Sequence, residues 1–180
     1  MSKLDQLRAL VSHDGLRDSL TGLMSFSSFT ESAVRELVSA QRFERKLNLF
    51  LIALTEPDLQ GIPSLVIRPG HEAGDLNEEE LYELAARVLR MAKLLSSELR
   101  SNDLIARYAL TEFLIMNFGD KVEITNKLSI IAENCGASLV SAEIGASQGT
   151  MTSTSPNHFQ DELRKAIASL ESELLATFRK

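Results

Sequence analysis

The amino-acid sequence predicts an α/β sandwich of the α+β kind, in which a mixed sheet containing a β-hairpin is flanked by helices. Three observations lead to this class. Helical and strand-like patterns alternate along the chain, the run 47–54 is apolar at nearly every position, and two short strand-like runs, 104–108 and 113–118, lie close together. Alternating elements favour a sheet covered by helices, and the short connection between the two runs favours a hairpin.

The first half of the chain is expected to hold two helices and the central strand. Apolar residues at helical spacing predict a short lead-in helix that ends before Gly15: Leu4, Leu7, Leu10 and Val11. The run Ser28-Phe29-Thr30-Glu31 has the form of a capping box, which predicts a second helix from there to about Arg45, with Phe43 at the end of its apolar face. The nearly all-apolar run 47–54 is typical of a strand covered on both faces.

The second half repeats the alternation after a long segment rich in helix and strand breakers. Residues 55–76 contain three prolines and three glycines around the apolar island 65–67, which predicts a loop with a short edge strand. Asn77 is the expected N-cap of a long helix that ends near Arg100. After the hairpin, the patterns predict a helix over 122–134 that ends at Cys135-Gly136, a strand over 138–144 and a last helix over 159–178.

Composition limits the function classes. A chain of 180 residues suits one domain. With 25 acidic against 19 basic side chains the formal charge is −6, which argues against nucleic acid as a partner. The sequence has neither the run of about eighteen apolar residues needed to span a membrane nor a signal peptide, so we expect no membrane insertion. The single thiol, Cys135, is expected to be buried and reduced, which suits the cytoplasm.

Three pieces of the chain, in order, carry a resemblance to a known family. They are Asp18-Ser-Leu-Thr-Gly-Leu23, the apolar strand that leads to Thr55, and the run from Arg100 to Phe113, which reads Arg-Ser-Asn-Asp-Leu-Ile-Ala-Arg-Tyr-Ala-Leu-Thr-Glu-Phe. Together they resemble the bacterial GGDEF, or diguanylate cyclase, domain over roughly residues 18–175. The resemblance implies a nucleotidyl-cyclase palm fold for residues 18–180, preceded by the lead-in helix at 1–17.

The resemblance also implies that catalysis is lost. Active members make cyclic di-GMP from GTP with two divalent ions held by carboxylates, and the matching positions here are Ala53 and Thr111. The paired glycines of the family motif are replaced by Ala109 and Leu110, whose side chains crowd the space for the nucleotide. The other positions of this degenerate active site are Thr55, Asp75 and Glu112. We therefore expect no catalytic residue, no metal and no other cofactor.

A second site is implied by the run Arg100-Ser-Asn-Asp103, which matches the R-x-x-D inhibitory site where many family members bind cyclic di-GMP. A guanidinium binds phosphate or the guanine edge in a bidentate manner, and a carboxylate accepts from the guanine N–H groups. The alternative is that both residues are only the solvated end of a helix and the start of a strand.

The family site is often completed by a further arginine from the helix after the hairpin, and residues 130–134 supply none. Arg42, Arg45, Arg107 or a second copy of the chain could complete it. Arg107 also has a purely structural interpretation, in which it pairs with a neighbouring acid.

The sequence is compatible with three functions. The first is a cyclic di-GMP receptor in which the ligand changes contacts with a protein partner or in a homodimer. The second is an interaction or dimerisation module that keeps the fold and has lost every nucleotide site. The third, a residual enzyme, has little support because two metal carboxylates are replaced at once.

Overall fold

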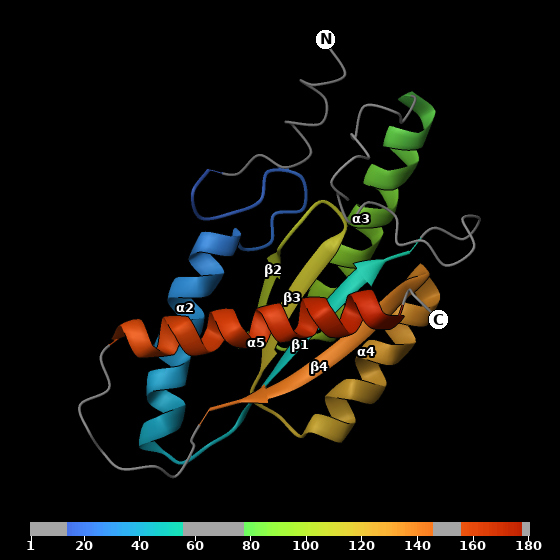
Figure 1. Cartoon of the computed structure of the whole chain (residues 1–180). Helices are drawn as coiled ribbons and strands as arrows, with labels where there is room; N and C mark the ends of the chain where they lie inside the picture. Colours follow the sequence, from blue (N-terminus) through green and yellow to red (C-terminus); the bar gives the residue numbers. More distant parts are fainter. Residues whose placement is uncertain (1–13, 56–77, 146–155, 178–180) are drawn as a thin grey trace.

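The computed structural model describes residues 14–55, 78–145 and 156–177 (Figure 1). The elements in chain order are α2 (Phe26–Arg42), β1 (Leu47–Leu54), α3 (Glu78–Glu98), β2 (Leu104–Arg107), β3 (Glu112–Asn117), α4 (Lys121–Cys135), β4 (Ala137–Ile144) and α5 (Pro156–Thr177). The predicted lead-in helix over 4–11, the edge strand at 65–67, Asp75 and the Asn77 cap lie outside the described residues.

The four strands form one sheet in the order β2-β3-β1-β4. Its three ladders are antiparallel, so the expectation of a mixed sheet was wrong, although the α+β class and the hairpin are confirmed. The reason lies in the hairpin. The crossover through α3 returns β2 in the same direction as β1, but β3 folds back between them and becomes the antiparallel neighbour of both.

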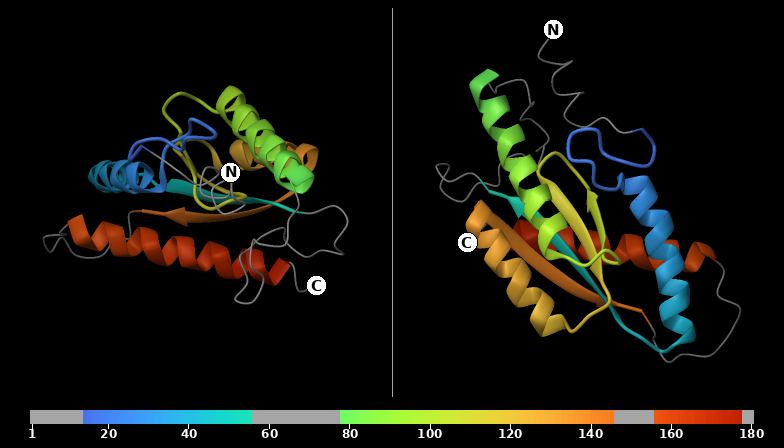
Figure 2. Two further views of the ribbon diagram at one scale, coloured as in Figure 1. Left: turned by 90° about the horizontal axis from the view of Figure 1, so that it is seen from above. Right: turned by 180° about the vertical axis from the view of Figure 1, so that it is seen from behind.

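Strand β1 separates two apolar cores, because its side chains alternate between the faces of the sheet. One core holds Leu49 and Leu51 with the apolar sides of α2 and α5. The other holds Phe50 and Ile52 with α3 and α4. All eight residues of β1 are buried, as expected for its apolar run. Figure 2 shows α5 on one side of the sheet and α3 with α4 on the other, while α2 lies along the β2 edge.

Helix α2 begins three residues earlier than predicted, and its end also differs. Ser25 is the N-cap, and its side chain accepts from the backbone N–H of Ser28 at 3.2 Å. Ser28 therefore lies inside the first turn, and the capping-box interpretation was wrong. The helix ends at Arg42, and Glu44 then adopts a left-handed φ of 51°. Phe43 is consequently 65% exposed and does not join the apolar face.

Helix α4 ends as the sequence predicts. Gly136 takes the left-handed conformation at φ 60°, which terminates the helix without the steric cost a side chain would add. Cys135, expected to be buried, is only partly so, and burial raises the pKa of its thiol. None of the described helices combines the length and the apolar composition that a membrane span requires.

Arg87 of α3 joins three segments through backbone carbonyls. Its guanidinium donates to the carbonyl of Thr55 at the end of β1 and, at 3.3 Å, to that of Gly136 after α4. A cation suits this place, because the carbonyls at the end of a helix carry partial negative charge.

Replacing Arg87 by methionine is expected to lower the free energy of unfolding by about 1–3 kcal/mol, because the partly buried carbonyls lose charged donors. Urea unfolding measures the change. Arg90→Met, at an exposed position one turn further along α3, is the matched control and should change stability by less than about 0.5 kcal/mol. Equal losses in the two variants would show that the bridge does not stabilise the fold.

The loop before α2 is attached to the outer edge of β2. Met24 donates its N–H to the carbonyl of Ile105 at 3.2 Å and accepts from the N–H of Arg107 at 3.3 Å. These bonds form an isolated parallel bridge between Met24 and Ala106. The loop therefore carries Asp18 to the hairpin end of β2.

Candidate functional site

The turn of the β2–β3 hairpin lies next to the end of β1. Ala53 pairs with Glu112 across the sheet, and the N–H of Leu54 donates to the carbonyl of Thr111 at 3.0 Å. The fold thus brings together Ala53, Thr111 and Glu112, which the sequence assigns to the degenerate active site. Leu110 lies in the same turn and is buried, and Ala109 is exposed.

Thr55 has a different environment from these residues. Its N–H and its hydroxyl both donate to the carbonyl of Gly136, each at 2.8 Å. Thr55 therefore ties the end of β1 to the end of α4.

Glu112 is a buried carboxyl group with another acid nearby. It is 8% exposed, and burial, followed by the charge of Glu171 on α5, raises its pKa to about 7. Tyr108 donates its hydroxyl to Glu171 at 2.6 Å, and burial and this bond raise the pKa of the phenol. Tyr108 therefore joins the hairpin to α5. Among the described residues, no group of three or more His, Cys, Asp or Glu is arranged to hold a metal ion.

Arg107 does not face the predicted ligand site. It is 5% exposed, and its Nη1 lies 3.3 Å from Oδ2 of Asp18. Its Nη2 donates to the carbonyl of Leu110 at 2.7 Å. Asp18 is fixed in turn by the N–H and hydroxyl of Thr21, at 2.8 and 2.7 Å. The structural interpretation of Arg107 therefore accounts for its position, and its guanidinium is not available to the ligand site to which the sequence assigned it.

The R-x-x-D run forms a tight turn between α3 and β2. Oδ2 of Asp103 accepts from the N–H of Arg100 at 2.8 Å, and Oδ1 accepts from Nδ2 of Asn117 at 2.7 Å. Asp103 is 8% exposed, whereas the side chain of Arg100 is 68% exposed and its Nη2 is 3.9 Å from Oε1 of Glu123. The buried carboxylate thus fixes the turn, and the exposed guanidinium projects from it.

A small polar pocket lies beside this turn. Its lining residues are two cations and four acids, together with uncharged neighbours: Arg100, Lys127, Glu98, Asp103, Asp120, Glu123, Leu99, Asn117, Gly119 and Ile124. Neither Arg42 nor Arg45 lines it. Arg42 is in the last turn of α2, and Arg45 lies over the ring of Phe43, with its Cζ 5.5 Å from the ring centroid.

Lys127 is the residue of this pocket that sequence reasoning missed. It comes from α4, the helix after the hairpin, and its Nζ donates to the carbonyl of Glu98 at 2.8 Å. An arginine was expected only over residues 130–134, about one turn further along the helix. The sequence did contain a signal for this residue, namely a lysine in the first two turns of α4, on the side of the helix that faces α3.

These features define a class of protein. It is an α+β domain with an antiparallel sheet, in which the β2–β3 hairpin turn lies beside the end of β1 and a small pocket lies at the start of β2. No family model matches the sequence, and a comparison with curated proteins gives no match. Solved structures do match, and they show that the fold is that of GGDEF domains.

Three structural neighbours illustrate this fold. The GGDEF domain of DgcB from Caulobacter crescentus, solved in complex with cyclic di-GMP, has a TM-score of 0.59 at 15% identity, covering 90% of this chain and 89% of that one. The GGDEF domain of FimX from Pseudomonas aeruginosa has a TM-score of 0.57 at 18% identity, covering 89% and 94%. The diguanylate cyclase SiaD from the same species, solved with its activator SiaC, has a TM-score of 0.60 at 20% identity, covering 98% and 62%.

Proposed function

We propose that the chain is a non-catalytic GGDEF-fold domain that binds cyclic di-GMP beside the turn Arg100–Asp103. The observation that carries the proposal is that the exposed guanidinium of Arg100 projects from a turn whose backbone is fixed by the buried carboxylate of Asp103. The proposed domain spans residues 18–180, with 1–17 as a lead-in segment. A reducing cytoplasm, expected from the single thiol of Cys135, is part of the proposal.

In this proposal the two residues have different roles. Arg100 supplies the direct contact, because its planar donors suit a phosphate or a guanine edge. Each oxygen of Asp103 already accepts one hydrogen bond. A carboxylate has about four acceptor positions, so Asp103 can both hold the turn and accept from the ligand. Lys127 lines the same pocket in place of the arginine expected from the family, and its Nζ lies 4.0 Å from Oε2 of Glu98.

The loss of catalysis is the second part of the proposal. Where the resemblance places two metal carboxylates, the chain has the methyl group of Ala53 and the hydroxyl of Thr111, which are 2% and 1% exposed. A buried methyl and a buried hydroxyl do not supply the negative charge that two divalent ions require. Incubation with GTP and magnesium should therefore yield no cyclic di-GMP, and its appearance would overturn this part.

Isothermal titration with cyclic di-GMP tests the receptor. Arg100→Ala should weaken binding by roughly tenfold or more, because charge-assisted contacts to phosphate are lost. Arg90→Ala removes an exposed arginine of α3 away from the pocket and should leave the affinity unchanged. Equal affinity in the wild type and Arg100→Ala, or no heat from either protein, would remove the receptor hypothesis.

A second candidate is an interaction or dimerisation module without nucleotide sites. The observation in its favour is that both carboxylate oxygens of Asp103 are already bonded within the protein. Absence of binding to cyclic di-GMP and GTP, together with a stable dimer or complex in analytical ultracentrifugation, would favour this function. The structure of SiaD with its activator is an example of a protein partner for a chain of this fold.

A further inference from the structure

A larger cleft lies at the other end of β2 from the R-x-x-D pocket. Its volume is about 560 Å³, and it lies between the first turns of α2, the β2–β3 turn and the start of α5. Clefts of this size are typical of small-ligand sites. None of its lining residues is shared with the pocket beside Arg100.

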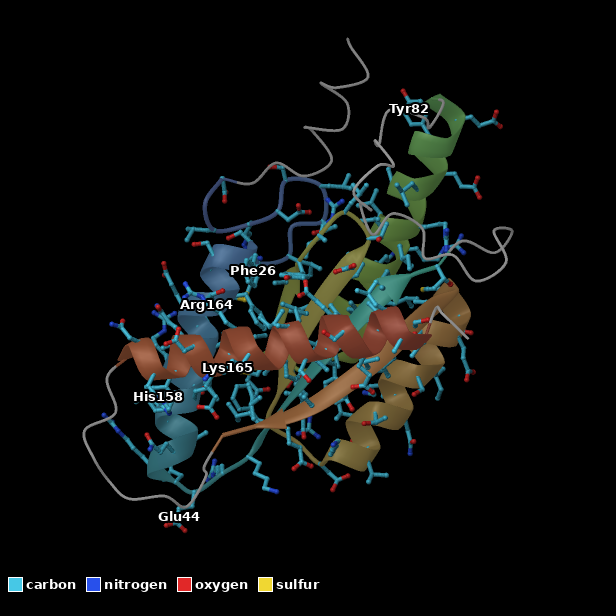
Figure 3. The ribbon with its side chains drawn as sticks, in the orientation of Figure 1. Phe26, Glu44, Tyr82, His158, Arg164 and Lys165 are labelled. Atoms are coloured by element: carbon cyan, nitrogen blue, oxygen red, sulfur yellow. The ribbon has the colours of Figure 1, made fainter. Side chains whose placement is uncertain are left out.

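Aromatic rings form one side of this cleft. Phe26, in the first turn of α2, is 38% exposed. Its ring meets that of Tyr108 edge to face, with centroids 4.9 Å apart. Figure 3 shows Phe26 at the hairpin end of α2, on the side of that helix toward the sheet. The Tyr108 hydroxyl is held by Glu171, so this ring is fixed in place.

The charges around the cleft sum to a negative value. At its base, Arg107 and Asp18 neutralise each other in a buried pair. Glu31 also lines the cleft, and among the described residues no cation lies within 4 Å of its carboxylate. Arg35, one turn further along α2, donates to Ser32 at 3.0 Å. Behind the tyrosine lies the carboxylate of Glu171, which adds to the negative potential.

An anion is therefore a poor ligand for this cleft, since its one arginine is already paired. A cation suits it for two reasons. Aromatic faces attract ammonium and guanidinium groups, and an adjacent carboxylate forms a charge-assisted hydrogen bond with them.

We propose that the cleft binds an organic cation, an alkylammonium or guanidinium group, that lies against Phe26 and Tyr108 and pairs with Glu31. This chemistry is available from two sources, a free small amine and a basic side chain of a peptide. The cleft shares Ala109 with the degenerate active site but shares no residue with the pocket beside Arg100, so its ligand does not depend on cyclic di-GMP binding.

The test is a titration of the isotope-labelled full chain followed by amide NMR shifts. The probes are agmatine as a free amine, the capped tripeptide Ala-Arg-Ala as a peptide source, and the same tripeptide with citrulline, whose side chain is neutral. Agmatine, the arginine tripeptide or both should give saturable shifts at residues lining the cleft, and these should weaken as ionic strength rises. The citrulline tripeptide should give none. The tighter of the two cationic probes identifies the source.

Variants locate the cation within the cleft. Glu31→Gln and Phe26→Leu are each expected to weaken binding roughly threefold, and the double variant roughly tenfold. Both positions are at least partly exposed, so the variants should fold, and the amide spectrum reports this directly. Glu83→Gln, on the exposed face of α3, is the control and should bind as the wild type does. No saturable shift with either cation, equal shifts with arginine and citrulline, or unchanged affinity in the double variant would overturn the proposal.

Discussion

Replacing Arg107 by methionine is expected to lower the free energy of unfolding by about 3–5 kcal/mol, because it leaves the buried carboxylate of Asp18 without its cation. The side chains of this pair are 2% and 8% exposed, at a separation of 3.3 Å. The variant also removes two donors from the carbonyl of Leu110. Urea unfolding at neutral pH measures the loss.

The double variant Asp18→Asn/Arg107→Met separates charge from packing. The amide oxygen of asparagine can still accept from Thr21, and no unpaired charge remains, so the double variant should be more stable than Arg107→Met alone. Arg164→Met is the control, because that arginine pairs with Asp161 in the open, where a salt bridge contributes less than about 1 kcal/mol. A loss in Arg107→Met no larger than in Arg164→Met would contradict the prediction.

Glu112→Gln should stabilise the protein at pH 8 and have little effect at pH 4. Burial, together with Glu171, raises the pKa of Glu112 from 4.5 to about 7. Below about pH 4.5 the carboxyl is neutral in both the folded and the unfolded chain. Between 4.5 and 7 the unfolded chain loses this proton first, so the stability of the wild type falls as the pH rises.

The full difference at pH 8 is at most about 3.5 kcal/mol, since the rise of the pKa from 4.5 to about 7 corresponds to about 1.4 kcal/mol per unit. Thermal unfolding of both proteins across this pH range measures it. The curves should coincide at low pH and separate through the window from 4.5 to 7. For the control Glu83→Gln, the plot of stability against pH should run parallel to that of the wild type over the whole range. A constant offset between Glu112→Gln and wild type, with no change of slope, would mean that Glu112 does not titrate in this window.

Local sequence was enough to predict most of the elements. The strand 47–54 is recognisable because seven of its eight residues are apolar and pack into one of the two cores. The end of α4 is recognisable because Gly136 permits a left-handed turn. The start of α2 was misplaced because Ser25 and Ser28 both suit an N-cap. The local sequence does not show which of the two serines has non-helical backbone angles. The direction of neighbouring strands was misjudged because it depends on where the hairpin inserts.

The candidate site was predictable only where neighbours in sequence are neighbours in space. Arg100 and Asp103 share one turn, so their spacing is informative. Arg107 was misassigned because its partner Asp18 is 89 positions away, and no local pattern connects them. Lys127 was missed for a similar reason, since only the packing of α4 against α3 brings it to the pocket. The cleft beside Tyr108 is formed by α2, the β2–β3 turn and α5, which are far apart in the sequence, so the spacing of residues does not predict it.

The bridge between Met24 and Ala106 has a consequence for self-association. Unpaired backbone groups along the side of a sheet are where foreign strands add and fibrils grow. At β2 the outward carbonyl of Ile105 and the outward N–H of Arg107 are already bonded to the chain's own Met24. A strand from a neighbouring molecule could therefore pair with β2 only after the two hydrogen bonds to Met24 had been broken and the loop displaced.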